Sequence, residues 1–122
     1  MKGYFGNLNG EARANSYFRR VVETGEKMQV VLMSLAIGEE IGMEVHPDNE
    51  QLLLNVAGQG KAILNGEEEK FDQGDMVLVR AGVEHNFINV GKEPLKIITL
   101  YSPPHHADGT IHKTKAEADA SE

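Results

Sequence analysis

The sequence predicts an all-β domain, either a sandwich or a barrel. Glycine and proline recur along most of the chain, at 13 and 4 positions, and separate short runs that are rich in Val, Ile and Leu. Runs of four to eight such residues at regular spacing, bounded by turn residues, are typical of these folds. The length of 122 residues is the usual size of one domain and is short for two.

The expected strands are short and follow one another closely. They are the apolar runs at residues 27–37, 51–56, 61–64, 67–71, 76–79, 86–90 and 95–101. Asn65 and Gly66 form a two-residue turn signal between two of these runs, which predicts a β-hairpin. A second turn is expected at residues 91–94, before the last run.

These runs place the barrel at residues 26–101. Residues 1–25 contain helix formers, but Asn15 and Ser16 interrupt them, so an N-terminal arm or an edge strand is expected there. Residues 102–122 are polar apart from Ile111 and scattered alanines. An irregular C-terminal tail, laid partly over the barrel and with a turn of helix near its end, is therefore expected.

The composition excludes several classes of protein. A net charge of −7 without a basic block argues against nucleic-acid binding. The longest apolar stretch, residues 30–37, is far shorter than the ~20 residues that span a bilayer. The absence of Cys excludes disulfides, a thiolate nucleophile and a Cys-based zinc site. Because the N-terminus also lacks an apolar signal segment, a cytoplasmic location is expected, with no nucleic-acid or membrane partner.

Two of the five histidines lie in the predicted β region, with a carboxylate at strand spacing. Glu44 and His46 are two residues apart, and residues i and i+2 of a strand face the same way. A carboxylate and an imidazole on one face can bind the same ion. His85 follows a break at residues 80–82 and starts a later strand, so all three side chains are candidate metal ligands.

The spacing of these residues resembles the two sequence motifs of the cupin superfamily. The motif positions are Gly38, Glu44, His46, Gln51 and Gly58 in the first, and Gly74, Arg80, Gly82, His85 and Asn89 in the second. The resemblance covers roughly residues 30–101, and the paired spacings are specific as a set. It is closest to small single-domain bacterial cupins, which are often described as mannose-6-phosphate isomerase-like.

Two positions depart from the usual cupin ligand set of three His and one Glu. Glu44 replaces the first His, and Gln51 replaces the Glu. Together these replacements keep one negative charge, and Glu44, His46 and His85 form the two-His, one-carboxylate set that holds non-haem Fe(II) with open positions. Gln51 can add its amide oxygen. Glu50 is the alternative fourth ligand, because the motif tolerates a spacing shorter by one residue.

The resemblance implies a double-stranded β-helix, which is a small jelly-roll barrel, with one divalent transition metal ion (Fe, Mn, Ni or Zn) inside. The metal ligands would be Glu44, His46, Gln51 and His85. A metal-dependent enzyme, isomerase- or dioxygenase-like, that acts on a small polar molecule is expected. The alternative is a non-catalytic module that binds or senses a small ligand. Cupins commonly dimerise, so a homodimer is also expected.

A structural role is the alternative for several of these side chains. His46 and His85 would then be hydrogen-bonded core residues, and Glu44 a surface carboxylate. In either case the flanking residues Met43 and Val45 are expected to be buried. The methionines expected to fill the core are Met28, Met33, Met43 and Met76. Arg80 is expected at the surface rather than against an anionic ligand.

Further polar residues are candidates around the barrel mouth. His105, His106 and His112 lie in a segment broken by Pro and Gly, so a flexible tail is favoured over a second metal cluster. Alternatively, Tyr101, His105 or His106 closes the mouth. Phe87 and Tyr101 are the candidate substrate contacts. Because histidine ligands must be neutral, metal retention is expected to fall as the pH drops through about 6.

Overall fold

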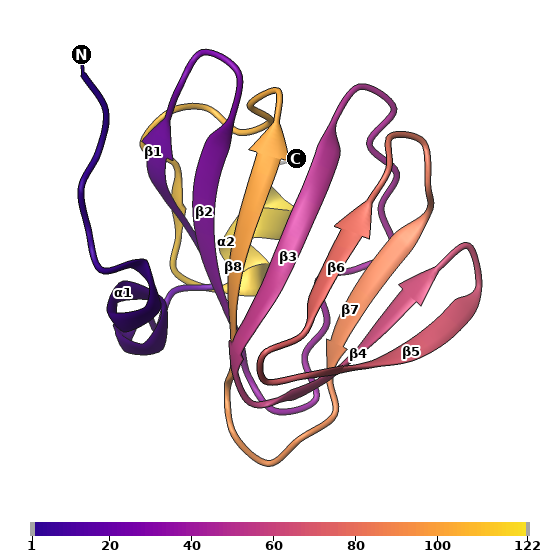
Figure 1. Cartoon of the computed structure of the whole chain (residues 1–122). Coiled ribbons are helices and arrows are strands. Elements are labelled where there is room, and N and C mark those ends of the chain that lie inside the picture. Colours follow the sequence, from indigo (N-terminus) through magenta and orange to yellow (C-terminus); the bar gives the residue numbers. More distant parts are fainter. Residues whose placement is uncertain (1, 122) are drawn as a thin grey trace.

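The computed structural model describes residues 2–121 as two antiparallel sheets packed face to face (Figure 1). The larger sheet has the strand order β6-β3-β8-β2-β1-β9, and the smaller has the order β5-β4-β7. The elements are α1 (Leu8–Ala14), β1 (Arg19–Thr24), β2 (Gln29–Leu35), β3 (Glu50–Ala57), β4 (Gln59–Leu64), β5 (Glu67–Asp72), β6 (Met76–Val79), β7 (His85–Asn89), β8 (Leu95–Ser102), β9 (Ile111–His112) and α2 (Lys115–Ala120). The expected all-β jelly-roll class is confirmed.

Every apolar run that was expected to form a strand does so, with ends that differ by at most two residues. The hairpin signal is also confirmed, because β4 and β5 pair from Leu64 and Glu67 outward across the two turn residues. Asn65 has φ 48° and Gly66 has φ 83°. Positive φ at both central positions is the requirement of the tight turn that matches the twist of paired strands.

Two ends of the chain are more regular than the sequence indicates. In residues 1–25, β1 lies inside the larger sheet between β2 and β9, so part of the expected arm belongs to the barrel. In residues 102–122, β9 pairs with β1, and a capping box of Thr114 and Glu117 starts α2. The missed signal was the pair of β-branched residues Val21 and Val22 before the Gly25 turn, which the preceding arginines obscured.

The interior between the sheets changes from apolar to polar along the strands. Met33, Leu53, Phe71, Phe87 and Ile97 are all 0% exposed and form the apolar part. Toward the other end of the same strands, the interior carries polar groups in register. Gln51 on β3 and Gln29 on β2 both pair with Tyr101 on β8, and all three are buried. The fold therefore provides an enclosed polar end, which is where a ligand site can form.

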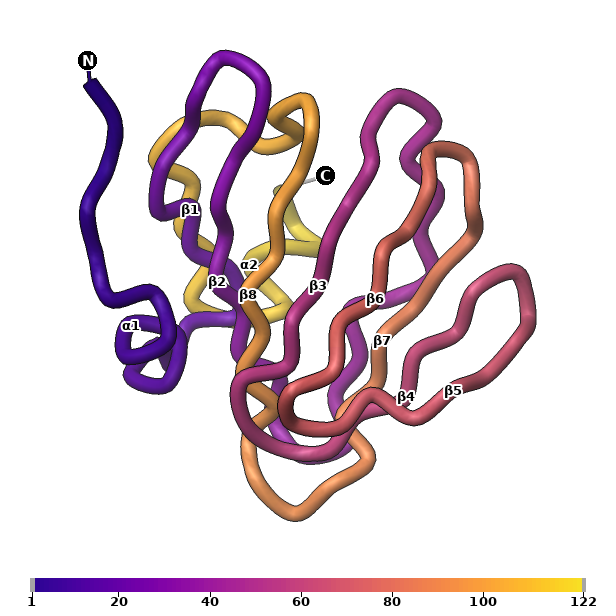
Figure 2. Tube along the Cα trace, viewed as in Figure 1, coloured from indigo at the N-terminus to yellow at the C-terminus, as the bar shows by residue number. Residues whose placement is uncertain are grey.

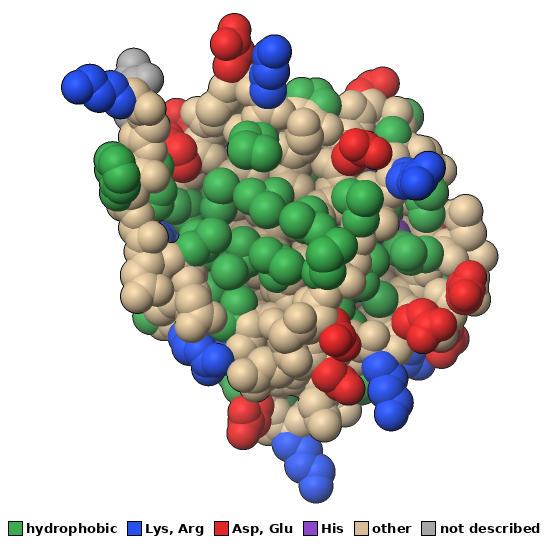
Figure 3. Space-filling view, viewed as in Figure 1, with side chains coloured by type: hydrophobic (Ala, Val, Ile, Leu, Met, Phe, Trp, Pro, Cys, Tyr) green, Lys and Arg blue, Asp and Glu red, His purple; other side chains and the backbone are tan. Residues whose placement is uncertain are grey.

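The outer face of the larger sheet is apolar as well. Register aligns two rows across β6, β3, β8 and β2, namely Leu78, Leu52, Leu100 and Val30, and Met76, Leu54, Ile98 and Leu32. Helix α1 covers part of this face, because Ala12 packs against Leu32 and Ile98. Figure 3 shows the hydrophobic side chains that remain on the surface over the centre of the sheet.

Three of the four methionines expected in the core are at the surface. Met33 is fully buried, but Met28, Met43 and Met76 are 54%, 52% and 56% exposed. The prediction was wrong for these three because the sequence pattern does not separate the inner face of a sheet from an apolar outer face. Among the described residues, neither helix has the length and apolar character needed to cross a membrane.

Candidate metal site

The segment between β2 and β3 runs antiparallel to β7 without forming a regular strand. Two isolated bridges join it to β7, Glu40 to Ile88 and Glu44 to His85. Figure 2 shows this stretch of the trace passing behind β6 and β7 before it returns to β3. At the second bridge, the Glu44 amide donates to the His85 carbonyl and the His85 amide donates to the Glu44 carbonyl, both at 2.9 Å. Residues that exchange both hydrogen bonds lie directly opposite each other and project to the same face.

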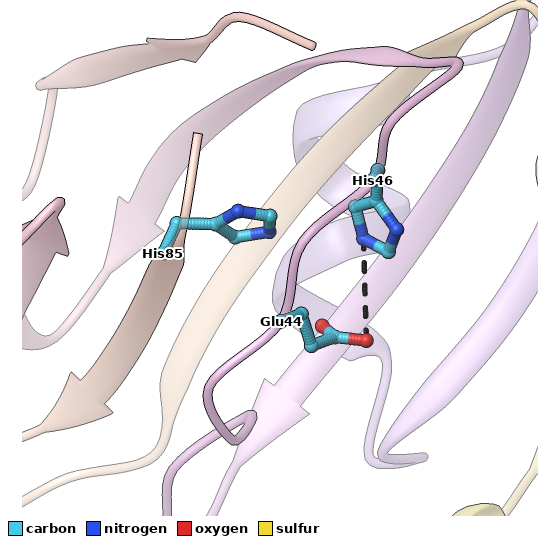
Figure 4. Close-up of side chains that lie close together, drawn as sticks. All are labelled: Glu44, His46 and His85. Carbon is cyan, nitrogen blue, oxygen red and sulfur yellow. Dashed lines mark ion pairs between the residues drawn. The ribbon is translucent and has the colours of Figure 1, made fainter. Parts of the chain in front are cut away.

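This pairing brings three candidate ligands together (Figure 4). His46 lies two residues beyond Glu44, and its carbonyl accepts a 2.9 Å hydrogen bond from the Gly82 amide, which fixes the end of the segment. One ligand atom from each of Glu44, His46 and His85 lies within 4.8 Å of the others. The Glu44 Oε2 to His46 Nε2 distance is 4.0 Å. Ligand atoms that surround one transition metal ion at about 2.0–2.2 Å are separated by similar or slightly shorter distances.

The protonation of the two histidines suits metal binding. The His85 Nδ1 atom lies 2.9 Å from the Val83 carbonyl, so this nitrogen carries the hydrogen and Nε2 keeps its lone pair. Burial lowers the pKa of His85, and burial together with the nearby His105, His85 and Arg19 side chains lowers the pKa of His46 to about 4. Both imidazoles are therefore neutral at pH 7, which is the form that binds a metal.

The alternative role as hydrogen-bonded core histidines does not fit the Nε2 atoms. His46 is 7% exposed and His85 is 1% exposed, yet the Nε2 atom of each is buried without a hydrogen-bond partner among the described residues. A buried polar atom that lacks a partner costs about 1–3 kcal/mol. Met43 and Val45, which were expected to be buried, are 52% and 48% exposed, because the backbone turns Glu44 and His46 inward instead.

Gln51 faces the same interior and Glu50 does not. Gln51 is 2% exposed on β3, whereas Glu50 is exposed on the opposite face of that strand. The Gln51 Nε2 atom donates to Thr99 Oγ1 at 3.0 Å and to the Tyr101 hydroxyl at 3.2 Å. The Gln51 Oε1 atom is buried and has no hydrogen-bond partner among the described residues. The donor set therefore fits a divalent cation, and Gln51 as the fourth ligand stays a prediction.

The two candidate substrate contacts are both enclosed. Phe87 is 0% exposed and packs edge-on against Phe71 in the apolar core, with 5.2 Å between ring centroids. Tyr101 is 2% exposed, and burial raises the pKa of its hydroxyl. Their roles toward a substrate stay predictions. Arg80 is exposed, as expected.

The segment that follows β8 lies against the site instead of extending away from it. Gln29 holds it there, because its Oε1 atom accepts hydrogen bonds from the His105 amide at 3.1 Å and the His106 amide at 2.9 Å. The His105 ring lies 4.3 Å from the His46 ring and stacks on Tyr101 at 5.3 Å. This geometry agrees with closure of the barrel mouth and not with a flexible tail. The signal in the sequence was a polar Gln29 at the start of an apolar strand.

A cavity of about 370 Å³ is lined in part by Glu44, one of the three candidate ligands. Its lining includes Arg19, Glu44, His105, His106, His112 and Ser121. Arg19 comes from β1, in the segment where an arm or an edge strand was expected, and it was not among the predicted site residues. Within residues 2–121, the group of metal-binding side chains at suitable spacing consists of Glu44, His46 and His85, so the tail histidines do not add a second cluster.

Comparison with known proteins agrees with this fold. Residues 31–101 match the family model described as a cupin domain. The chain belongs to the cupin family. This cupin is 43% identical over 128 residues to the uncharacterized protein YrkC of Bacillus subtilis (strain 168), a match that covers 99% of this chain and 68% of YrkC.

Two further matches show how far the likeness extends. The crystal structure of BH2720 from Bacillus halodurans superimposes with a TM-score of 0.96 at 38% identity, covering 98% of this cupin and 95% of that chain. The mannose-1-phosphate guanylyltransferase ManC of Salmonella typhimurium is 27% identical over 81 residues, which are 66% of this cupin and 17% of ManC. The second match therefore concerns one portion of a much longer protein.

Removal of a ligand side chain should release the metal. We expect purified, untagged protein to take up about one equivalent of Zn(II) per chain. Glu44→Gln and His85→Ala should each weaken Zn(II) affinity at least about tenfold, because each removes a donor atom. Elemental analysis and calorimetric titration measure both quantities.

Glu50→Gln is the matched control for these ligand variants. It removes a carboxylate one residue from Gln51 but on the exposed face, so Zn(II) affinity should stay at the wild-type value. Gln51→Ala should lower the affinity. A loss of Zn(II) from Glu50→Gln equal to that from Glu44→Gln would contradict the assignment of the inner face.

The pH at which metal is lost should be lower than the sequence alone indicates. A proton competes with the metal for the imidazole lone pair, and the pKa of His46 is lowered to about 4. Metal content after dialysis should therefore be constant from pH 8 to about 5 and should fall toward pH 4. Circular dichroism at each pH shows whether the protein is still folded when the metal is released. Loss of half the metal near pH 6 from folded protein would contradict this expectation.

Proposed function

We propose that this cupin is a metal-dependent enzyme, isomerase- or dioxygenase-like, that acts on a small polar molecule. The proposed ligands of one divalent transition metal ion (Fe, Mn, Ni or Zn) are Glu44, His46, Gln51 and His85. One observation carries the proposal. Three buried polar atoms of this set, His46 Nε2, His85 Nε2 and Gln51 Oε1, have no hydrogen-bond partner within residues 2–121. Such atoms are costly in a folded chain unless a ligand satisfies them.

The adjoining cavity supports a catalytic role over a structural one. Structural metal sites are closed by protein ligands, whereas catalytic sites keep a position open to substrate. Glu44 belongs both to the group of candidate ligands and to the cavity lining. When bound, a divalent ion supplies Lewis-acid polarisation of a substrate oxygen or, if it is iron, electrons for reaction with dioxygen.

The residues around the cavity can bind a polar molecule without adding charge. Burial is the main cause that lowers the pKa of His105 and of His106, the latter to about 3. The two imidazoles are therefore neutral at pH 7, and each has one donor and one acceptor nitrogen. The His106 Nε2 atom lies 3.4 Å from the Tyr101 hydroxyl, so the substrate-facing polar groups are linked to the Gln51 side chain through Tyr101.

Activity should require the metal ion. Protein loaded in turn with Fe(II), Mn(II), Ni(II) or Zn(II) is incubated with small hydroxy acids, oxo acids and sugars. We expect at least one pairing to consume oxygen or to exchange substrate hydrogen with solvent deuterium, as an electrode and NMR detect. His85→Ala should abolish that turnover. A chain that stays metal-free after reconstitution would instead favour the non-catalytic binding or sensing module.

We also propose that a second copy of the chain covers the apolar outer face. The members of the two apolar rows that α1 does not cover, among them Met76 and Leu78, form an exposed apolar patch of the kind that marks association surfaces (Figure 3). Phe5, in the N-terminal segment, is 98% exposed and is available to a partner. A homodimer buries the same patch from both copies.

Sedimentation should therefore give about twice the chain mass of 13.4 kDa. Leu78→Glu should shift the protein toward monomer, because it places a charge within the apolar row. Val90→Glu is the control, since Val90 is exposed to a similar degree but lies in the loop between β7 and β8. A monomeric wild type, or a dimer insensitive to Leu78→Glu, would exclude this interface.

A further inference from the structure

A buried arginine lines the cavity beside the candidate metal site. Arg19 lies on β1 opposite His112 on β9, and its side chain is 6% exposed. Arginine is always charged at physiological pH, and burial of a charge is costly unless it is paired. The Phe18 ring, whose centroid lies 5.3 Å from Arg19 Cζ, stabilises part of this charge, and hydrogen-bond partners are needed for the rest.

The donors of Arg19 are only partly used. Its Nη1 atom lies 3.1 Å from His112 Nδ1, and His112 Nε2 lies 3.1 Å from Ser121 Oγ. In that arrangement the His112 ring accepts from Arg19 through Nδ1 and donates to Ser121 through Nε2. The Nε atom of Arg19 is buried and has no hydrogen-bond partner among the described residues. His112 therefore holds the Nη1 end of the guanidinium in place, while the Nε donor has no hydrogen-bond partner within residues 2–121.

The cavity walls are fixed to the barrel. Gln29 binds the backbone of His106 in both directions, donating to its carbonyl at 2.7 Å and accepting from its amide at 2.9 Å. Asn49 donates to the Pro103 carbonyl. These buried side chains hold the segment after β8 against the barrel, so the wall that this segment gives to the cavity is fixed by hydrogen bonds.

Arg19 and Glu44 are the charged side chains of the cavity lining. Burial lowers the pKa of His105 and of His106, so these two imidazoles are neutral at pH 7 and add no charge. A guanidinium binds a planar carboxylate through two parallel hydrogen bonds. Because Arg19 is the cation of the lining and the Glu44 carboxylate lies in the same lining, a singly charged ligand is favoured over a doubly charged phosphate.

We propose that the cavity binds the carboxylate group of a small organic acid through Arg19, which directs the rest of that molecule toward Glu44, His46 and His85. This inference rests on the proposed function and specifies its substrate class as small carboxylates. Arg19 is then a specificity-determining residue supplied by the first strand. The volume of about 370 Å³ is sufficient for a small organic acid.

Pyruvate is a suitable probe, with pyruvamide as its uncharged counterpart and inorganic phosphate as the alternative anion. Calorimetric titration of Zn(II)-loaded protein should show saturable binding of pyruvate and weaker binding of both others. Arg19→Gln should weaken pyruvate binding about 10- to 100-fold, as expected for loss of a charge-assisted pair. Arg20→Gln, on the next residue of β1, should leave binding unchanged.

Arg19→Lys is the control for a folding defect in Arg19→Gln, because lysine keeps the positive charge and a long aliphatic chain. It should bind pyruvate more weakly than wild type but more tightly than Arg19→Gln. Equal binding of pyruvate and pyruvamide, no saturable binding of pyruvate by wild type, or wild-type affinity in folded Arg19→Gln would overturn the proposal.

The Zn(II) content of the same samples distinguishes a failure of the carboxylate site from a failure of the proposed metalloenzyme function. Arg19-dependent pyruvate binding without zinc supports the carboxylate site and refutes the metalloenzyme, whereas normal zinc with Arg19-independent binding refutes the carboxylate site alone.

Discussion

The paired backbone hydrogen bonds between Glu44 and His85 determine where the candidate ligands lie. Side chains alternate along an extended chain, so a slip of one residue in this pairing would turn Glu44 and His46 outward together. No regular strand fixes the segment, and its register depends on a few contacts with β7 and on the Gly82 amide that binds the His46 carbonyl. The chemistry of the site thus depends on a short and irregular stretch of backbone pairing.

The polar end of the interior carries a cost that the rest of the fold must offset. In the described part of the chain, His46, His85 and Gln51 each bury a polar atom that has no hydrogen-bond partner, and so does Arg19, at Nε. A compact apolar core between the sheets includes Phe71 and Phe87 and offsets the free-energy cost of these buried polar groups. Unsatisfied acceptors and an unsatisfied cationic donor on adjoining walls favour a ligand that has both a metal-binding group and a negative charge.

Much of the fold could be predicted because strand runs and turns are local signals. Gln51 was preferred over Glu50 from the motif spacing that the sequence shares with cupins, and the burial pattern of β3 agrees with that choice. Pairing between strands that are far apart in the sequence could not be predicted from such local signals. Arg19 is polar in sequence but points inward, because β9 pairs with β1 from far along the chain. His105 reaches His46 only because Gln29 anchors the segment after β8.

X-ray absorption of the Zn(II)-loaded protein tests the central claim most directly, because it identifies the atoms around the ion. We expect scattering from two imidazole rings, with oxygen donors completing the shell, at about 2.0–2.2 Å. If His85→Ala retains zinc, its spectrum should show one imidazole ring around the ion instead of two. A spectrum with oxygen donors alone would show that the backbone pairing at Glu44 and His85 does not build a metal site.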